Sequence, residues 1–208
     1  MDRRKMVLVL AAVLGLSTAF SAGPVGTQVY FPVDLNGELD GVPYRILVPA
    51  DWNGTLLVYA HGYNEGVTPP LLAPQAQDVD GLVKQGFALA ASRFAGSGWN
   101  VKEGMQNTVA LTAAFRDLVG PPVKTVLWGR SMGGLLALGM IEKFPGLYDG
   151  AVALCPPAAG TPRRFDQGLD LALAYAVAFG WDPFWGSPGD LRDDLDFMND
   201  VLPHIVRQ

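Results

Sequence analysis

One serine of the chain lies in a pattern that is typical of an enzyme nucleophile. Residues 129–133 read Gly-Arg-Ser-Met-Gly, a G-x-S-x-G pattern with Ser131 at its centre. A strand pattern over 124–128 precedes it and a helix pattern over 135–143 follows it. A tight strand-to-helix turn lifts the serine hydroxyl out of the backbone, where it can attack a carbonyl carbon. We therefore predict that Ser131 is a catalytic nucleophile.

The neighbours of the serine have separate predicted roles. Side chains at 129 and 133 would collide across so tight a turn, so Gly129 and Gly133 are expected to form the elbow. Ser131 then lies at a helix N-terminus, where backbone N–H groups favour developing negative charge. The N–H of Met132 is therefore predicted to be one donor of an oxyanion hole.

A second oxyanion donor is expected in the loop after the apolar strand over 55–60, which reads His61-Gly62-Tyr63. The N–H of Gly62 or of Tyr63 is the candidate donor. Two roles are open for His61: a general base, or a brace that holds the loop by hydrogen bonds. We favour the brace, because the base follows the nucleophile in the chain order of such sites.

Together these residues resemble the α/β-hydrolase family. The resemblance covers about residues 28–157, with the strand leading into His61-Gly62, the elbow at 129–133 and a strand over 151–154. In such families the elbow serine attacks an ester or amide carbonyl and forms an acyl-enzyme, which water then releases. No phosphate-binding loop accompanies the elbow, and we expect no cofactor.

Three further short patterns occur in the chain: Trp52-Asn53-Gly54, His61-Gly62-Tyr63, and Gly98-Trp99 followed by Gly104. Together they resemble, more narrowly, secreted bacterial hydrolases of the esterase and prolyl-oligopeptidase-like kind. This resemblance implies a secreted hydrolase that cleaves carboxylic esters through an acyl-enzyme on Ser131. Two alternatives stay open: a peptidase of the prolyl-oligopeptidase-like type, and a truncated or non-catalytic protein that keeps the scaffold.

The acid and the base of a triad are harder to find. The family order is serine, then acid, then histidine, each on a loop after a later strand. His204 is the only histidine after Ser131, so it is the one candidate base, with Asp182 or Asp200 as its acid partner. No convincing strand lies after Cys155. The resemblance therefore implies a chain truncated at its C-terminus, without the last strands and their acid and base.

The segments that must position these residues alternate between strand and helix patterns, which indicates an α/β fold with a mostly parallel sheet flanked by helices. Gly104 weakens the first turn of one helix pattern, so that helix should start near Asn107, although Asn100 and Glu103 could cap an earlier start. We expect strands over 28–34, 42–48, 55–60, 87–92, 125–128 and 151–154, and helices over 75–85, 101–118 and 132–143.

Two short patterns in the core have competing interpretations. Asn53-Gly54-Thr55 matches the N-glycosylation pattern, but we favour an Asn-Gly turn that feeds the next strand. Asn36-Gly37 and Asp40-Gly41 are expected to form the turn between the first two strands. Cys155 is the one cysteine, and its place at the end of an apolar segment predicts a buried, inert thiol rather than a nucleophile.

Residues 158–208 are expected to form a cap or lid. A helix over 169–179, an aromatic and proline-rich loop over 181–189 and an acidic helix over 191–206 are predicted there. The eight aspartates between 166 and 200 indicate a solvated helical face, and no metal site is predicted. The aromatic residues that could cover an apolar acyl pocket are Phe179, Trp181, Phe184 and Trp185.

The composition and charge of the chain exclude some classes of binding partner. The 208 residues are 50% apolar and 17% charged, with a net charge of −5, which is globular and excludes a disordered chain. The acidic balance disfavours nucleic-acid binding. The family resemblance implies a small-molecule ester or a peptide as the substrate.

The first residues resemble an export signal. Three basic residues, Arg3, Arg4 and Lys5, precede an apolar run over 6–16, and small residues follow. We predict a signal peptide over 1–21, a hydrolase core over 22–157 and the cap over 158–208. The product would be secreted or periplasmic, with no membrane attachment after cleavage. The alternative is a protein anchored by an uncleaved signal.

Overall fold

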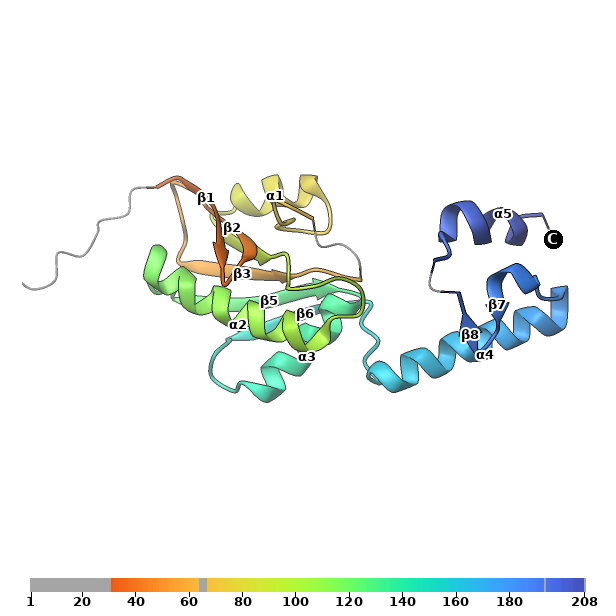
Figure 1. Cartoon of the computed structure of the whole chain (residues 1–208). Helices are drawn as coiled ribbons and strands as arrows, with labels where there is room; N and C mark the ends of the chain where they lie inside the picture. The colour runs from red at the N-terminus through yellow and green to blue at the C-terminus, as the bar shows by residue number, and fades with distance from the viewer. Residues whose placement is uncertain (1–30, 64–66, 193, 208) are drawn as a thin grey trace, which may run out of the picture.

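The computed structural model describes residues 31–63, 67–192 and 194–207 (Figure 1). The predicted signal peptide lies outside the described residues. The strands are β1 Val33–Leu39, β2 Val42–Val48, β3 Thr55–Ala60, β4 Ala88–Ser92, β5 Lys124–Arg130, β6 Gly150–Leu154, β7 Gly186–Ser187 and β8 Asp190–Leu191. The α-helices are α1 Ala76–Val83, α2 Val101–Leu118, α3 Met132–Lys143, α4 Thr161–Phe179 and α5 Leu202–Ile205. The part of the chain after β6 also contains a 3₁₀ turn over Pro183–Trp185 and a π-helical turn over Phe197–Val201.

Six strands form one sheet in the order β1-β2-β4-β3-β5-β6. β2 runs antiparallel to both of its neighbours, and β4, β3, β5 and β6 run parallel to one another. The mostly parallel sheet flanked by helices confirms the predicted α/β fold class. Because the four parallel strands end at the same edge, the loops that follow them meet there.

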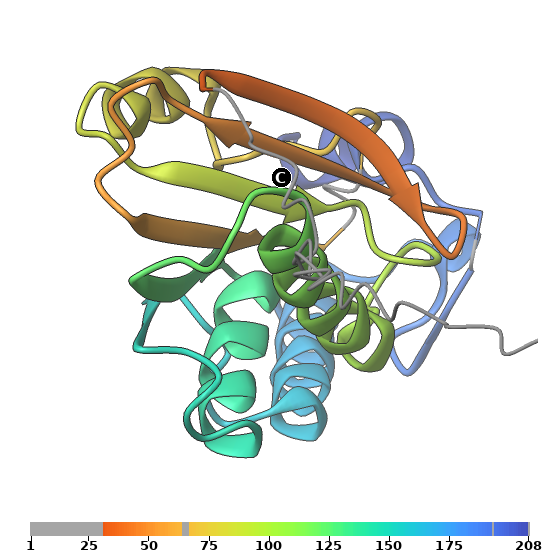
Figure 2. The ribbon, with the colours of Figure 1, turned by 90° about the vertical axis from the view of Figure 1, so that its left-hand side faces the viewer.

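Helices cover both faces of the sheet (Figures 1 and 2). α2 and α3 lie on one face, where Leu111 and Met140 pack against Ile46, Leu56 and Leu127 in the main buried cluster. α1 lies on the other face, over a second cluster built on Tyr59, Leu72, Leu89 and Ala91. The near-continuous apolar runs of β3 and β4 follow from this burial on both faces.

The first hairpin differs from its prediction. β1 begins at Val33, so the predicted strand over 28–34 is confirmed at its last two residues, and residues 28–30 lie outside the described residues. Asn36-Gly37 lies inside β1. The register pairs Leu39 with Val42, so Asp40-Gly41 alone forms the turn, with φ of 50° and 77°. The reason is the alternation of apolar and exposed polar residues through Leu39, which favours continued strand with one face on the core.

The start of α2 also differs. The helix begins at Val101, not near Asn107, and Gly104 lies inside its first turns. A Cβ at Gly104 would lie 2.5 Å from a methyl carbon of Leu136, so close packing of α2 on α3 requires glycine here. Asn100 makes no capping hydrogen bond, and its amide donates to the carbonyl of Ala95 instead.

The Asn-Gly turn before β3 is confirmed. Gly54 has φ of 84°, and the side-chain oxygen of Asn53 accepts a hydrogen bond from the N–H of Thr55 at 2.9 Å. The Asn53 amide also donates to the carbonyl of Gln85 at 2.9 Å, which ties the turn to the segment before β4.

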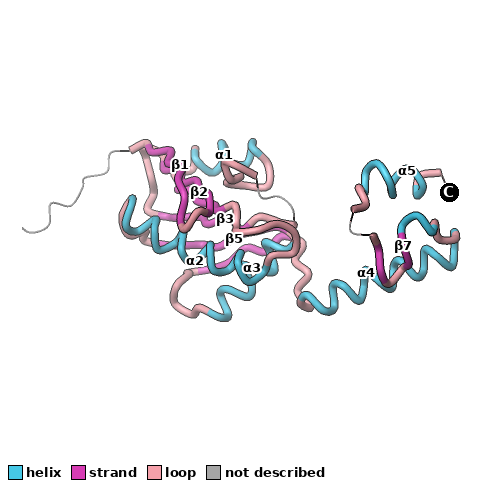
Figure 3. Tube along the Cα trace, in the orientation of Figure 1, coloured by secondary structure: helices cyan, strands magenta, loops and turns pink. Residues whose placement is uncertain are grey.

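The segment after β6 is mostly helical and extends away from the sheet (Figures 1 and 3). α4 starts at Thr161, earlier than predicted, and none of its residues is buried. The predicted acidic helix over 191–206 is wrong, because regular helix spans only 202–205 after the π-helical turn. The carboxylate of Asp196 accepts hydrogen bonds from the N–H groups of Met198 and Asn199. These bonds cap the π-helical turn, which begins directly after Asp196.

Within the described residues, no helix combines the length and the apolar composition that crossing a bilayer needs.

Candidate active site

Ser131 occupies a sharp turn between β5 and α3. Its φ of 56° and ψ of −122° lie outside the backbone regions that residues other than glycine usually adopt. Such a conformation costs of order 1–3 kcal/mol and persists only where the surroundings impose it. The N–H of Ser131 donates to the carbonyl of Leu154 at 2.9 Å, and its carbonyl accepts from Leu135 at 3.1 Å. Both backbone groups of the serine are therefore fixed.

The two elbow glycines lie where no side chain fits. A Cβ at Gly129 would lie 2.5 Å from the carbonyl group of Gly133 and 2.6 Å from the carbonyl oxygen of Ala60. A Cβ at Gly133 would run into the carbonyl oxygen of Ala60 itself. The turn is therefore pressed against the end of β3, which brings the loop after β3 next to the elbow.

Met132 is the first residue of α3 and is fully buried. As a first-turn residue it has no acceptor for its N–H inside the helix. The positive end of the helix adds to the preference of this N–H for a developing anion. Met132 therefore lies directly after the serine, at the N-terminus of α3.

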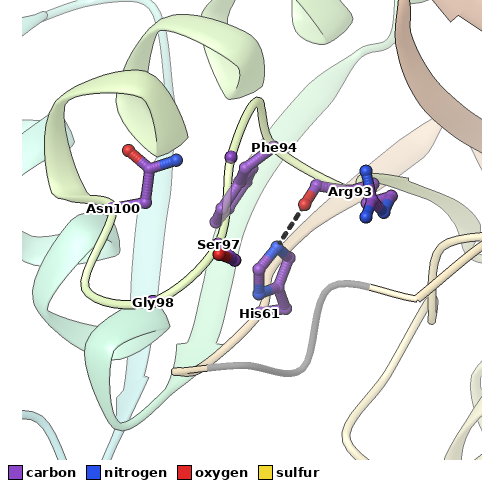
Figure 4. A pocket seen from close by; sticks show the side chains of 7 residues that line it. His61, Arg93, Phe94, Ser97, Gly98 and Asn100 are labelled. Carbon is purple, nitrogen blue, oxygen red and sulfur yellow. Dashed lines mark hydrogen bonds between the residues drawn. The ribbon is translucent and has the colours of Figure 1, made fainter. Parts of the chain in front are cut away.

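The loop after β3 is held by His61. Nδ1 lies 2.7 Å from the carbonyl oxygen of Gly62, and Nε2 lies 2.8 Å from the carbonyl oxygen of Arg93 (Figure 4). The ring is 7% exposed and stacks on Phe94, with centroids 3.9 Å apart. Both ring nitrogens thus face backbone carbonyls, which is the arrangement of a brace. Tyr63 follows with its side chain exposed.

A cavity of about 110 Å³ lies beside this loop. Figure 4 shows it between His61 and the loop that joins β4 to α2, with Ser97 opposite the imidazole and Phe94 behind it. The N–H of Ala95 donates to the side-chain oxygen of Asn107 at 2.8 Å, which fixes the base of the loop. The cavity therefore has a defined wall opposite His61.

The structure pairs His204 with one of its two predicted acid partners. Its Nδ1 lies 3.3 Å from a carboxylate oxygen of Asp182, and its ring packs edge-on against Trp185. Asp200 instead accepts a hydrogen bond from the N–H of Asp196. α5, which carries His204, lies at the side of the C-terminal segment away from β5 and α3 (Figure 1). His204 and Ser131 are therefore not brought together.

The prediction of a buried cysteine is wrong, because Cys155 is exposed. β6 is the last strand of the sheet among the described residues, so its outward side chains, Val152 and Leu154, are also exposed. Cys155 follows that strand with φ of 47°, in the loop at the carboxyl edge of the sheet. No group of metal-binding side chains is present among the described residues.

Ion pairing and burial shift two pKa values in the core. Hydrogen bonding to Arg45 lowers the pKa of Asp34, in an ion pair of 2.8 Å that joins β1 to β2. Burial raises the pKa of Tyr148, whose hydroxyl lies 3.3 Å from that of Thr112.

Sequence reasoning missed Phe94. This residue has φ of 63°, is 1% exposed and forms the stacking partner of His61. A signal was present in its position, two residues after the predicted strand over 87–92 and before the glycine-rich turn at 96–98.

No protein-family model matches the chain. An o-phthalyl amidase of Xanthobacter agilis is 28% identical over 144 residues, which are 68% of this chain and 30% of that protein. The chain therefore spans less than a third of the length of this curated relative.

Solved structures with similar arrangements include hydrolases of two kinds. A carboxyl esterase from Bacillus coagulans has 14% identity and a TM-score of 0.45, over 70% of this chain and 50% of that one. Porphyromonas gingivalis dipeptidyl peptidase 4 has 17% identity and a TM-score of 0.46, over 60% of this chain and 20% of that one.

Proposed function

We propose that the chain carries the nucleophile and the oxyanion hole of a serine hydrolase that acts on carboxylic esters. The observation that carries the proposal is the backbone of Ser131, which is held at φ 56° and ψ −122° between β5 and α3. Backbone strain of this kind is typical of positions where the turn presents a reactive side chain to a substrate.

The proposed reaction is acyl transfer. The hydroxyl oxygen of Ser131 attacks the carbonyl carbon, and the negative charge that develops on the carbonyl oxygen is stabilised by the N–H of Met132 and that of Gly62 or Tyr63. The bond to the alcohol then breaks, the alcohol leaves with a proton, and Ser131 holds the acyl group as an ester. Water attacks this acyl-enzyme and releases the acid and the free serine.

The general base is the part of this site that the described residues do not assemble. Both ring nitrogens of His61 are engaged by carbonyl groups, and His204 pairs with Asp182 in the C-terminal segment. An elbow and an oxyanion hole without the base still give residual catalysis over water. We therefore expect slow acylation of this chain by activated acyl compounds.

A second candidate substrate class is the amide. The similarity to an o-phthalyl amidase favours it, and the same attack by Ser131 would then expel an amine in place of an alcohol. The two classes differ in the leaving group, since an amine must receive a proton as it leaves and an activated phenolate need not. An amide substrate therefore depends more strongly on a general acid.

Labelling and turnover together test the proposal. A fluorophosphonate should modify Ser131 in the folded protein, and Ser131→Ala should abolish the modification. Turnover of short nitrophenyl esters without turnover of anilides supports the ester class, and anilide turnover supports the amide class. Cleavage of acyl-naphthyl peptides alone supports the peptidase alternative. Folded protein that is neither labelled nor active contradicts a hydrolase.

We also propose export, which rests on the basic start and the apolar run at residues 3–16. Expression in a bacterial host should yield a product that begins near residue 22 in the exported fraction. N-terminal sequencing of that product distinguishes a cleaved signal from an anchor.

A further inference from the structure

We propose that Phe94 is a positioning residue that holds the two halves of the oxyanion hole in register, an inference that rests on the proposed function of Ser131. One donor is expected from the loop after β3, and the other is the N–H of Met132 in α3. These two segments are far apart in the sequence, and Gly133 of α3 lies directly against Ala60 at the end of β3. The side chain of Phe94 adds a further contact, because it lies in one buried cluster with Ala60 and Met132.

The backbone of Phe94 is the first observation. Its φ of 63° is rare for any bulky residue, and two glycines with positive φ, Gly96 and Gly98, stand only two and four residues later. Its N–H donates to the hydroxyl oxygen of Ser92 at 3.2 Å, and Asn107 and Asn100 hold the next residue. The surroundings thus impose an uncommon backbone on an aromatic residue rather than on a glycine.

The face of the Phe94 ring is the second observation. It stacks on the imidazole of His61 with centroids 3.9 Å apart and an angle of 26° between the rings. The carbonyl oxygen of the residue before it, Arg93, accepts a hydrogen bond from Nε2 of the same imidazole at 2.8 Å. His61 is therefore held at one edge and on one face by two consecutive residues, and Gly62 follows directly.

The surroundings of Phe94 are the third observation. It belongs to a fully packed cluster with Ala60, Met132 and Leu136, which are the end of β3 and the first turns of α3. Gly104 of α2 lies so close that an added Cβ would be 3.1 Å from two carbons of the Phe94 ring. The ring is thus enclosed by the elements that carry the two donors.

The cavity explains why this contact matters. His61 also borders the space of about 110 Å³ that Ser97 and Gly98 line (Figure 4). The stack on Phe94 is the packed side of the ring, and a flat partner there fixes its tilt and with it the direction of the Gly62 backbone.

The test compares Phe94→Leu with Phe115→Leu. Phe115 is also fully buried, but it lies in the cluster between the sheet and α2, and the same change there is a control for loss of core volume. Phe94→Met is a second variant, because methionine fills an irregular space without a flat ring. Two quantities are measured in each protein: the rate of fluorophosphonate labelling of Ser131, and hydrogen exchange at the amides of Gly62, Tyr63 and Met132.

We expect Phe94→Leu and Phe94→Met to slow labelling by about tenfold or more, because small displacements of an oxyanion donor have effects of this size. Both should speed exchange at the three amides beyond any global change, whereas Phe115→Leu should alter labelling by less than about twofold. An unchanged labelling rate, or exchange at these amides equal to that of Phe115→Leu, overturns the inference. If the unsubstituted protein is not labelled, the proposed function fails, and the exchange pattern alone decides the role of Phe94.

Discussion

The sheet with its three covering helices and the segment after β6 bury their apolar residues in different ways. In the first region, side chains from six strands and from α2 and α3 fill clusters that exclude water. In the second, Trp185 is the one buried apolar residue among those after position 160 whose side chains the structure describes. The second region is held instead by contacts among aromatic rings, such as Trp181 against Trp185 at 5.3 Å.

This difference separates the region that bears the elbow from the region that was predicted to cover it. α4 has 19 residues and buries none of them, and Leu171 and Val177 are 72% and 89% exposed. Its start is tied to the core through Trp99, which donates to the hydroxyl of Thr161 at 2.9 Å and packs edge-on against Phe165. The geometry of Ser131 should therefore depend on the core and scarcely on α4.

The largest expected difference between the regions comes from a matched pair of leucines. Leu111→Ala removes a fully buried side chain from α2 and leaves a cavity, so it should lower the free energy of unfolding by about 2–5 kcal/mol. Leu171→Ala in α4 should change it by less than about 0.5 kcal/mol. Urea unfolding monitored by circular dichroism measures both. Equal losses of unfolding free energy in Leu111→Ala and Leu171→Ala would mean that α4 is buried in solution.

Two helical glycines give the next effect. Gly133→Ala places a Cβ against the carbonyl oxygen of Ala60, so it should cost about 1–3 kcal/mol in the free energy of unfolding and displace Ser131. Gly168→Ala in α4 meets no atom within 4 Å and should stabilise by about 0.5–1 kcal/mol, because alanine is the better helix former. Thermal unfolding of the two variants should show a loss of stability for Gly133→Ala and a gain for Gly168→Ala. A Gly133→Ala protein of unchanged stability would contradict the geometry of the elbow.

The smallest effect is electrostatic. The pKa of Asp34 is lowered in the folded protein, so its pair with Arg45 stabilises above the unfolded pKa and is lost as pH falls through the folded value. Because the pair is largely exposed, Asp34→Asn should cost no more than about 0.2–1 kcal/mol at pH 7, and the difference should vanish in acid.

The control for this pair is Asp194, which bonds to Arg192 in the C-terminal segment. Asp194→Asn should leave the unfolding of the core unchanged at every pH, since that pair joins residues two positions apart. Unfolding curves of both variants between pH 2 and pH 7 make the comparison. A pH-independent difference for Asp34→Asn would show that the ion pair is not its cause.

Much of the core could be predicted because local patterns and burial agree there. β2, β3 and α3 have the predicted bounds, and the elbow pattern lies between a strand and a helix as expected. The errors arise where tertiary packing overrides a local signal. Gly104 weakens a helix in isolation but allows α2 to approach Leu136, so the helix starts early.

In the candidate site, too, local patterns predict some features and tertiary packing decides the others. Ser131, Met132 and the loop at His61 follow from short patterns whose chemistry imposes their spacing. The stack of Phe94 on His61 joins residues 33 positions apart, and no periodicity in the chain indicates it. The exposure of Cys155 was missed because an apolar pattern does not say whether its strand lies at the edge of the sheet.

The central claim is that the backbone of this chain presents Ser131 as a nucleophile beside an oxyanion hole. The most direct test is fluorophosphonate labelling of the folded protein, followed by peptide mass spectrometry to locate the modified residue. The account predicts modification at Ser131, loss of that modification in Ser131→Ala or after unfolding, and its retention in Leu171→Ala. Folded protein that stays unmodified, or that is modified equally in Ser131→Ala, would contradict it.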